Sequence, residues 1–273
     1  TNQIINKIYN KVIDELPKIN SKERTKSELS ELTLALQCGG SDSYSGITAN
    51  PALGFASDLL VQYGGSTILS ETPEIYGAEH LLIDRALKES DIKKLINQIK
   101  WWKNYTQING GSLDNNPSPG NKKGGLTTIL EKSLGAVAKS GNSTMINVLD
   151  YAEKISEKGF HFMDSPGYDP VSVTGQVASG SNLICFTTGR GSCFGFKPTP
   201  SLKISSNTNM YNNLEEDMDI NAGTIMDGIH SIEEIGTKIF NELIEVASGK
   251  KTKSEINEYG DDEFNPWVIG ATM

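Results

Sequence analysis

The stretch LTLALQCGGSD, residues 32–42, places a short apolar run directly before a polar, glycine-rich turn. Such a run, bounded by turn residues, is typical of a strand that is buried on both faces of a sheet. The same arrangement recurs after residues 67–70, 160–163, 183–186 and 202–204, where Gly, Ser, Thr, Asn or Pro follow the apolar residues. We therefore predict five buried strands, each with a polar segment at its carboxyl end.

Helical patterns separate these runs. Apolar residues recur at helical spacing, or a helix-opening Pro or cap residue is present, over residues 51–63, 73–87, 90–99, 125–139 and 231–247. Short strands that alternate with helices indicate an α/β fold, with a mostly parallel sheet covered by helices on both faces. We expect a single domain over residues 1–273, with residues 1–25 as an amphipathic connector helix and residues 104–124 as the longest loop.

Composition narrows the class of protein. The 273 residues include 25 Lys and Arg against 34 Asp and Glu, a formal net charge of −9. This acidity argues against nucleic-acid binding, which normally requires a basic surface. Since no apolar run approaches the roughly 18 residues of a membrane span, we expect no membrane association. The three cysteines form neither a disulfide framework nor a zinc motif, so we expect a cytoplasmic protein that acts on a small molecule.

Polar segments after parallel strands converge on one edge of the sheet, where open α/β sheets bind their ligands. Gly lets backbone amides approach an anion closely, and Ser, Thr and Asn add hydrogen-bonding groups. Arg190, flanked by Gly189 and Gly191, adds a fork that matches a carboxylate. The edge is therefore predicted to form a pocket for a small polar anion.

These same segments resemble the altronate and galactarate dehydratase family. The resemblance is carried by QCGGSDSYSGITANPALG (37–54), SETPEIYGAEHLL (70–82), NPSPGNKKGGLTTILEKSLG (116–135), MDSPGYDPVSVTGQVASGSNLICFTTGRGS (163–192) and SSNTNMY (205–211). They stand in family order and cover almost the whole chain after residue 30. The chain resembles only the C-terminal catalytic part of that family; the small N-terminal domain and the middle domain of full-length members have no counterpart in it.

The resemblance implies a Rossmann-like domain of unusual connectivity that removes water from a sugar acid such as galactarate or altronate. It also implies a 2-keto-3-deoxy product and dependence on Fe²⁺. Such a reaction needs a base beside the carboxylate, a cation or hydrogen-bond donors to hold the enediolate, and assistance to the leaving hydroxide.

Candidate residues for these tasks stand in the polar segments. Asp42 and Glu71 would bind the metal through oxygen, and Cys38 could add a thiolate that suits iron; Glu74 contributes only if it faces the crevice. For proton transfer the candidates are His80 and Lys122. Substrate carboxylates and hydroxyls would be held by side chains that share hydrogen-bonding groups, namely Ser41, Asn50, Thr188, Arg190 and Asn207.

Each assignment has a plainer alternative. Cys38 could be an inert buried thiol, Glu71 could cap a following helix, and His80 could be structural. The function also has alternatives. One is elimination of a sulfonate from sulfolactate, and another is a non-catalytic fragment that binds sugar acids. Homodimerisation and association with the upstream domains both remain open.

Overall fold

The protein, described here from a computed structural model over residues 1–113 and 116–270, is built on one seven-stranded sheet in which every pairing is parallel. The order across the sheet is β3-β4-β2-β1-β5-β6-β7. The strands are β1 Thr33–Cys38, β2 Ser66–Leu69, β3 Met145–Leu149, β4 Gly159–Met163, β5 Leu183–Thr188, β6 Ser201–Ser205 and β7 Ile220–Asn221. The predicted α/β fold with a parallel sheet is confirmed.

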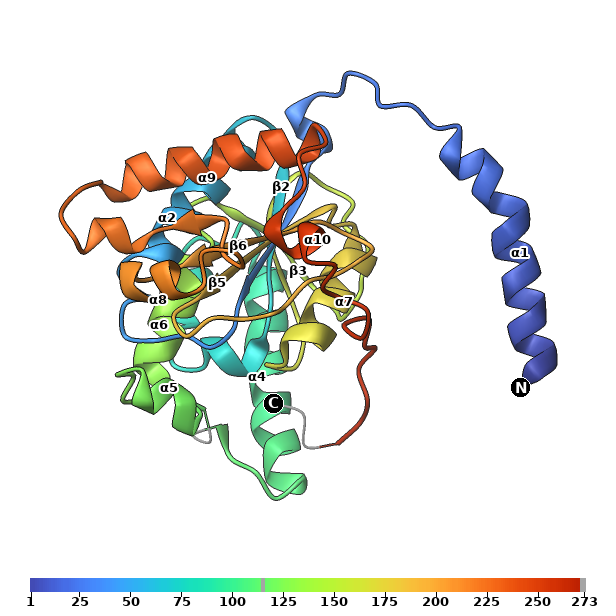
Figure 1. Ribbon diagram of the computed structural model, residues 1–273. Coiled ribbons are helices and arrows are strands. Elements are labelled where there is room, and N and C mark those ends of the chain that lie inside the picture. The colour runs from blue at the N-terminus through green and yellow to red at the C-terminus, as the bar shows by residue number, and fades with distance from the viewer. Residues whose placement is uncertain (114–115, 271–273) are drawn as a thin grey trace.

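Both faces of the sheet are covered, as the continuous apolar strands predicted. Successive side chains of a strand point to opposite faces, so Leu34 and Leu36 belong to the large core beneath α2 (Ala49–Gln62) and α9 (Ile232–Ala247). Ala35 points the other way, into a smaller core with Val173 of α7 (Asp169–Ser179). Figure 1 shows α2 and α9 together on one side of the sheet and α7 on the other.

Further helices complete the described part of the chain. They are α1 (Asn2–Asn20), α3 (His80–Ile83), α4 (Glu89–Ile108), α5 (Pro119–Lys123), α6 (Ile129–Ala138), α8 (Thr208–Asn213) and α10 (Lys253–Ile256), with 3₁₀ turns at η1 (Leu29–Glu31), η2 (Thr72–Ile75) and η4 (Gly223–Ile225). α1 has no buried residue and stands away from the body (Figure 1). No helix in the described part of the chain has the length and apolar character of a membrane span.

One predicted helix is wrong. Residues 73–87 form the 3₁₀ turn η2 and the short helix α3, because Gly77 between them has a φ of 89°, which a right-handed helix does not accommodate. The apolar residues that suggested a helix are nevertheless inside, since Ile75 and Leu82 are both buried. The apolar pattern therefore predicted correctly that these residues are buried, but it did not predict the conformation of the backbone.

Smaller corrections concern the boundaries. The predicted 125–139 helix begins at Ile129, where the Thr128 hydroxyl accepts a hydrogen bond from the Glu131 amide. The predicted 104–124 loop is shorter, since α4 extends to Ile108 and α5 occupies its end. Strands β3 and β7 were missed.

The topology brings the important strand ends together. From β1 the chain proceeds to β2 on one side, and β5, β6 and β7 follow on the other side. The boundary between β1 and β5 is therefore a topological switch point, the place where open α/β sheets bind ligands. Cys38 is the last residue of β1, so it lies at this point.

Candidate active site

Three side chains that could bind a cation, one thiol and two carboxyls, meet at the carboxyl edge of the sheet. Cys38 ends β1, Glu71 follows β2 after one residue, and Glu74 lies in η2. One possible ligand atom from each lies within 4.8 Å of the other two, and all three residues are buried. Strand pairing explains the meeting, because β1 and β2 are parallel neighbours and their ends must coincide. The group is called the acidic cluster below.

Glu71 occupies an unusual position in this cluster. Its φ of 74° lies in the left-handed region, which few non-glycine residues adopt. Both carboxylate oxygens are buried, and neither has a hydrogen-bond partner of good geometry among the described residues, although the nearby Gln37 amide and the Lys139 charge oppose the rise of its pKa. Burial, together with the negative charges of Glu74 and Asp169, raises its pKa well above the ordinary value. A buried carboxylate without donors is costly unless it is protonated or meets a cation.

Two lysines, the partly buried Lys132 of α6 and the buried Lys139 directly after this helix, approach the cluster. Lys132 Nζ lies 2.7 Å from Glu74 Oε1 and donates to Asn116 Oδ1 at 2.6 Å. Lys139 Nζ donates to Cys38 Sγ at 2.9 Å. The two lysines are seven residues apart, about two helical turns, which places them on the same face.

The charges in this group influence one another. Burial by itself lowers the pKa of Lys132, but the charges of Glu74 and Cys38 outweigh it and the pKa is raised. For Lys139 the balance is similar, with Cys38 and Glu71 outweighing burial. Both lysines therefore carry a positive charge at neutral pH.

Asp169 adds a fourth acid at the first turn of α7. Its carboxyl packs against Gly39 and accepts a hydrogen bond from Gln37 Nε2 at 3.0 Å. The residue is partly exposed, but this carboxyl is turned inward. Burial, followed by the charge of Glu74, raises its pKa from 3.8 to about 7.

The donor set fits a divalent cation. Burial raises the pKa of the Cys38 thiol, as it does for Glu71 and Asp169, so these groups favour their protonated forms when no cation is near. Fully ionised, as metal binding requires of its ligands, the acidic cluster and Asp169 would carry four negative charges against the two ammonium groups of Lys132 and Lys139. A divalent cation would neutralise the remainder. The two unpartnered oxygens of Glu71 are the atoms in the cluster that lack any other partner, and they therefore supply the structural argument for such a site.

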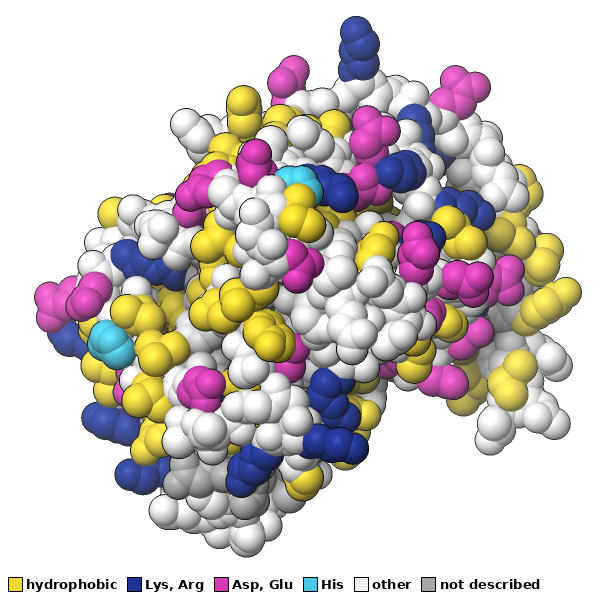
Figure 2. All heavy atoms as spheres, turned by 60° about the vertical axis from the view of Figure 1, so that its left-hand side comes forward, with side chains coloured by type: hydrophobic (Ala, Val, Ile, Leu, Met, Phe, Trp, Pro, Cys, Tyr) yellow, Lys and Arg dark blue, Asp and Glu magenta, His cyan; other side chains and the backbone are white. Residues whose placement is uncertain are grey.

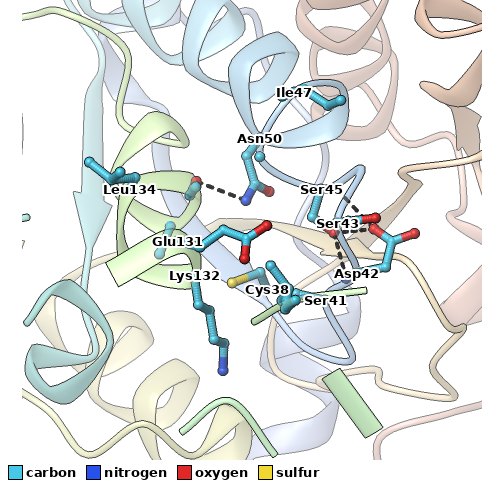
Figure 3. A pocket seen from close by; sticks show the side chains of 14 residues that line it. Cys38, Ser41, Asp42, Ser43, Ser45, Ile47, Asn50, Glu131, Lys132 and Leu134 are labelled. Atoms are coloured by element: carbon cyan, nitrogen blue, oxygen red, sulfur yellow. Dashed lines mark hydrogen bonds between the residues drawn. The ribbon is translucent and has the colours of Figure 1, made fainter. Parts of the chain in front are cut away.

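A cavity of about 240 Å³ opens beside the cluster. Cys38 and Lys132 line it, together with Ser41 and Asn50. Figure 3 shows that these side chains come from the end of β1 and the turn that follows it, the start of α2, and α6. Hydroxyl and amide groups, together with a lysine in the lining, suit a small hydroxylated acid.

The mouth of the cavity is partly apolar. Ile47 and Leu134 line the cavity and are exposed, and Tyr44 and Leu130 are exposed on the same segments of the chain. Figure 2 shows apolar side chains gathered in patches among charged ones on the face turned forward. Exposed apolar groups beside a polar cavity are typical of a surface that another part of a protein covers.

Asp42 lies outside the acidic cluster. Its Oδ1 accepts hydrogen bonds from Ser45 N at 2.9 Å, Ser45 Oγ at 2.8 Å and Ser206 Oγ at 2.7 Å, and its Oδ2 accepts from Asn207 Nδ2 at 3.0 Å. These bonds hold the turn after β1 against the turn after β6. Glu74, rather than Asp42, completes the potential ligand set with Cys38 and Glu71.

The predicted substrate-binding residues divide between two places. Ser41 and Asn50 line the cavity, although the Asn50 amide also donates to Gly135 O at 2.9 Å. Arg190 and Asn207 line a second, larger hollow of about 810 Å³. Thr188 is buried, and its hydroxyl has no hydrogen-bond partner among the described residues.

His80 and Lys122 are both exposed, and neither lines the cavity. Their predicted role in proton transfer stays a prediction. Lys132, Lys139 and Asp169 were not among the residues predicted from the sequence. A signal for the lysines was present, because a helix was predicted over 125–139 and their spacing puts them on one face of it.

Comparison with known proteins decides the family. A profile of the C-terminal domain of D-galactarate/altronate dehydratases matches residues 29–272. The chain belongs to this family. The resemblance found in the polar segments is thereby confirmed, and the acidic cluster, Lys132 and the cavity all lie within the matched part of this dehydratase-family chain.

Relatives within the dehydratase family cover most of the chain. Galactarate dehydratase (L-threo-forming) of Escherichia coli K12 is 45% identical over 236 residues, which are 86% of this chain and 45% of that protein. Altronate dehydratase of Bacillus subtilis 168 is 41% identical over 253 residues, 92% of this chain and 50% of that protein. The subunit beta of (2R)-sulfolactate sulfo-lyase from Chromohalobacter salexigens is 31% identical over 239 residues, 85% of this chain and 61% of that protein. The chain spans about half the length of the two dehydratases.

Proposed function

We propose that this chain is the catalytic part of a metal-dependent sugar-acid dehydratase, which removes water from an aldarate or aldonate to leave a keto-deoxy acid. The observation that carries the proposal is the acidic cluster, paired with two lysines and placed beside a polar cavity at the switch point of the sheet. The names of the relatives support the substrate class.

The reaction makes a specific electrostatic demand. Removing a proton beside a carboxylate leaves an enediolate with two negative charges, which water stabilises poorly. Lys132 lines the cavity, and its ammonium group contacts Glu74 Oε1 and Asn116 Oδ1. Its third hydrogen would be donated to a carboxylate oxygen of a bound acid. Because its raised pKa keeps it charged, Lys132 would hold both the substrate carboxylate and the charge that develops on it.

Cys38, Glu71 and Glu74 would hold the divalent cation, which we expect to be Fe²⁺. A bound cation of this kind supplies Lewis acidity toward oxygen. The thiolate is a softer donor than carboxylate and favours iron over magnesium. Lys139, by donating to Cys38, would orient the sulfur and help keep it ionised.

The proposal also concerns the exposed mouth of the cavity. Because the chain spans about half the length of the dehydratases, we propose that the exposed apolar mouth of the cavity, at Ile47 and Leu134, is covered by another domain or by a second copy of the chain. Either partner would exclude water from the cavity. The partner would also add contacts to the substrate.

The test combines cation binding with turnover. The chain is loaded anaerobically with Fe²⁺ or Mn²⁺, cation binding is measured by calorimetry, and keto-deoxy acid formation from galactarate and altronate is followed. We expect Glu71→Gln to weaken cation binding at least tenfold. Glu79→Gln, a change in the same segment outside the cluster, should bind like the unmodified chain.

Two results would contradict the proposal. One is equal cation affinity in Glu71→Gln and the unmodified chain. The other is turnover that persists in the presence of a chelator. Lys132→Met should retain the cation but lose at least 100-fold in kcat/KM, because removing a donor to a developing oxyanion typically costs about 10²–10³.

A second candidate is carbon–sulfur elimination from a sulfolactate. It is favoured by the relative named as a sulfo-lyase subunit, of which the chain covers the larger share, 61%. Both reactions pass through the same enediolate and differ only in the leaving group. Release of sulfite, instead of a keto-deoxy acid, would identify it.

A further inference from the structure

We propose that Asp164 is a positioning residue that holds the backbone of Glu71 in its left-handed conformation and thereby places the Glu71 carboxylate in the acidic cluster. The link to cation binding rests on the proposed function. The positioning itself rests on hydrogen bonds that connect β4, α4 and the turn after β2.

The turn at Glu71 needs support because its conformation is unfavourable. A non-glycine residue with a φ of 74° is strained relative to ordinary backbone, because its Cβ approaches the carbonyl oxygen that follows. Two hydrogen bonds from the β4 side oppose this strain. Glu71 N donates to Ser165 Oγ at 3.0 Å, and Thr72 N donates to Ser165 O at 3.0 Å.

Asp164 strengthens the attachment of this turn through the side chain of Thr72. The Thr72 hydroxyl donates to Asp164 Oδ1, and the same oxygen accepts from Trp102 Nε1 at 2.8 Å. The amide of Asp164 donates to Leu149 O at 3.0 Å. The carboxylate is therefore fixed to β3 by its own backbone and to α4 by the indole, and it presents one oxygen to the residue beside Glu71.

Trp102 is itself closely packed. It is fully buried, and its ring stacks on that of Trp267 at a centroid distance of 5.3 Å and an interplanar angle of 11°. The donor cannot follow Asp164 if the carboxylate shifts. Hydrogen bonds from rigid neighbours to a ligand-bearing segment are the means by which proteins orient metal ligands, and losing one typically costs about 10–100-fold in affinity.

The test removes a single hydroxyl. Thr72→Val keeps the shape of the side chain but cannot donate to Asp164, whereas Thr72→Ser keeps the donor. Thr106→Val is the matched control, because the Thr106 hydroxyl is also buried but donates within α4 to Lys103 O at 3.1 Å. Hydrogen exchange of the peptide spanning 69–75 and calorimetric titration with Mn²⁺ are measured on the full chain, with thermal unfolding as the check on folding.

Expected in Thr72→Val are about tenfold faster exchange at 71–72 and about tenfold weaker Mn²⁺ binding, with Thr72→Ser and Thr106→Val close to the unmodified chain. Unchanged exchange in Thr72→Val overturns the positioning role. Faster exchange with unchanged Mn²⁺ affinity overturns its link to the ligand. If the unmodified chain binds no Mn²⁺, the cation site of the proposed function fails, while the exchange measurement still decides whether Asp164 holds the turn.

Discussion

Asp169→Asn tests the electrostatics of the site through the stability of the chain. The substitution keeps the shape of the side chain and an oxygen that can accept from Gln37 Nε2, as Asp169 does at 3.0 Å. It removes only the ability to ionise beside Glu71 and Glu74. In the chain kept free of divalent cations, the two forms should therefore differ only where Asp169 titrates.

The size and sign of the effect follow from the raised pKa. An unfolded chain releases the Asp169 proton near 3.8, and the folded chain releases it at about 7. Below 3.8 both states hold the proton, so Asp169 contributes no pH dependence there. Between these values only the unfolded state has released it, so the free energy of unfolding falls as pH rises, by about 1.4 kcal/mol per pH unit. Above about 7 the loss is complete and amounts to about 4 kcal/mol at most.

Urea unfolding of both chains with a chelator, at intervals from pH 4 to pH 8.5, measures this difference. We expect equal stability at pH 4 and a growing advantage for Asp169→Asn that levels off above neutral pH. Because Glu71 titrates in the same group, the rise should be broader than that of an isolated carboxyl. A difference that does not vary with pH would refute the burial and the charge interactions inferred for Asp169.

The remaining predictions concern Asp42, which the sequence analysis assigned to the metal, and Arg190, which it assigned to the substrate. Asp42→Ala should lower the free energy of unfolding by about 3 kcal/mol or more, because it leaves the donors of Ser45, Ser206 and Asn207 without their acceptor, while Mn²⁺ affinity stays within twofold; a tenfold loss of affinity with little change in stability would restore Asp42 as a ligand. Arg190 lines the second hollow rather than the cavity beside the acidic cluster, and we expect one substrate carboxylate to extend into that hollow. Arg190→Ala should then raise KM about tenfold by removing one charge-assisted hydrogen bond, with cation binding unchanged by calorimetry, and an unaltered KM would remove Arg190 from the substrate site.

Predictions from the sequence succeeded where a local pattern has one physical meaning. The run at 32–37 is short, apolar and followed directly by turn residues, which favours a buried strand, and it forms β1. Residues 231–247 carry a capping box at Ser231 and an apolar stripe, and they form α9 within one residue of the expected bounds. β7 was missed because two residues, Ile220 and Asn221, carry no periodicity.

The candidate site was predicted only in part, because local patterns do not show which distant residues meet in space. Cys38 and Glu71 were found because each directly follows or ends a strand. Glu74 was left undecided, because its direction depended on a helix that Gly77 interrupts. The helix predicted over 125–139 places Lys132 and Lys139 on one face, but it does not show that this face turns toward Cys38. Asp169 is remote in sequence from Cys38, and no local pattern distinguishes it from other polar residues.

The amino-acid sequence by itself determined that strands alternate with helices, that polar segments follow the strands, and to which family the chain is similar. Each of these depends on neighbours along the chain, or on long matching segments. Only the tertiary structure decided that Glu74 rather than Asp42 joins Cys38 and Glu71, and that Lys132 and Lys139 face them. The physical reason is that β1, β2 and α6 meet through the order of strands in the sheet and the packing of its helices, which no stretch of the chain specifies alone.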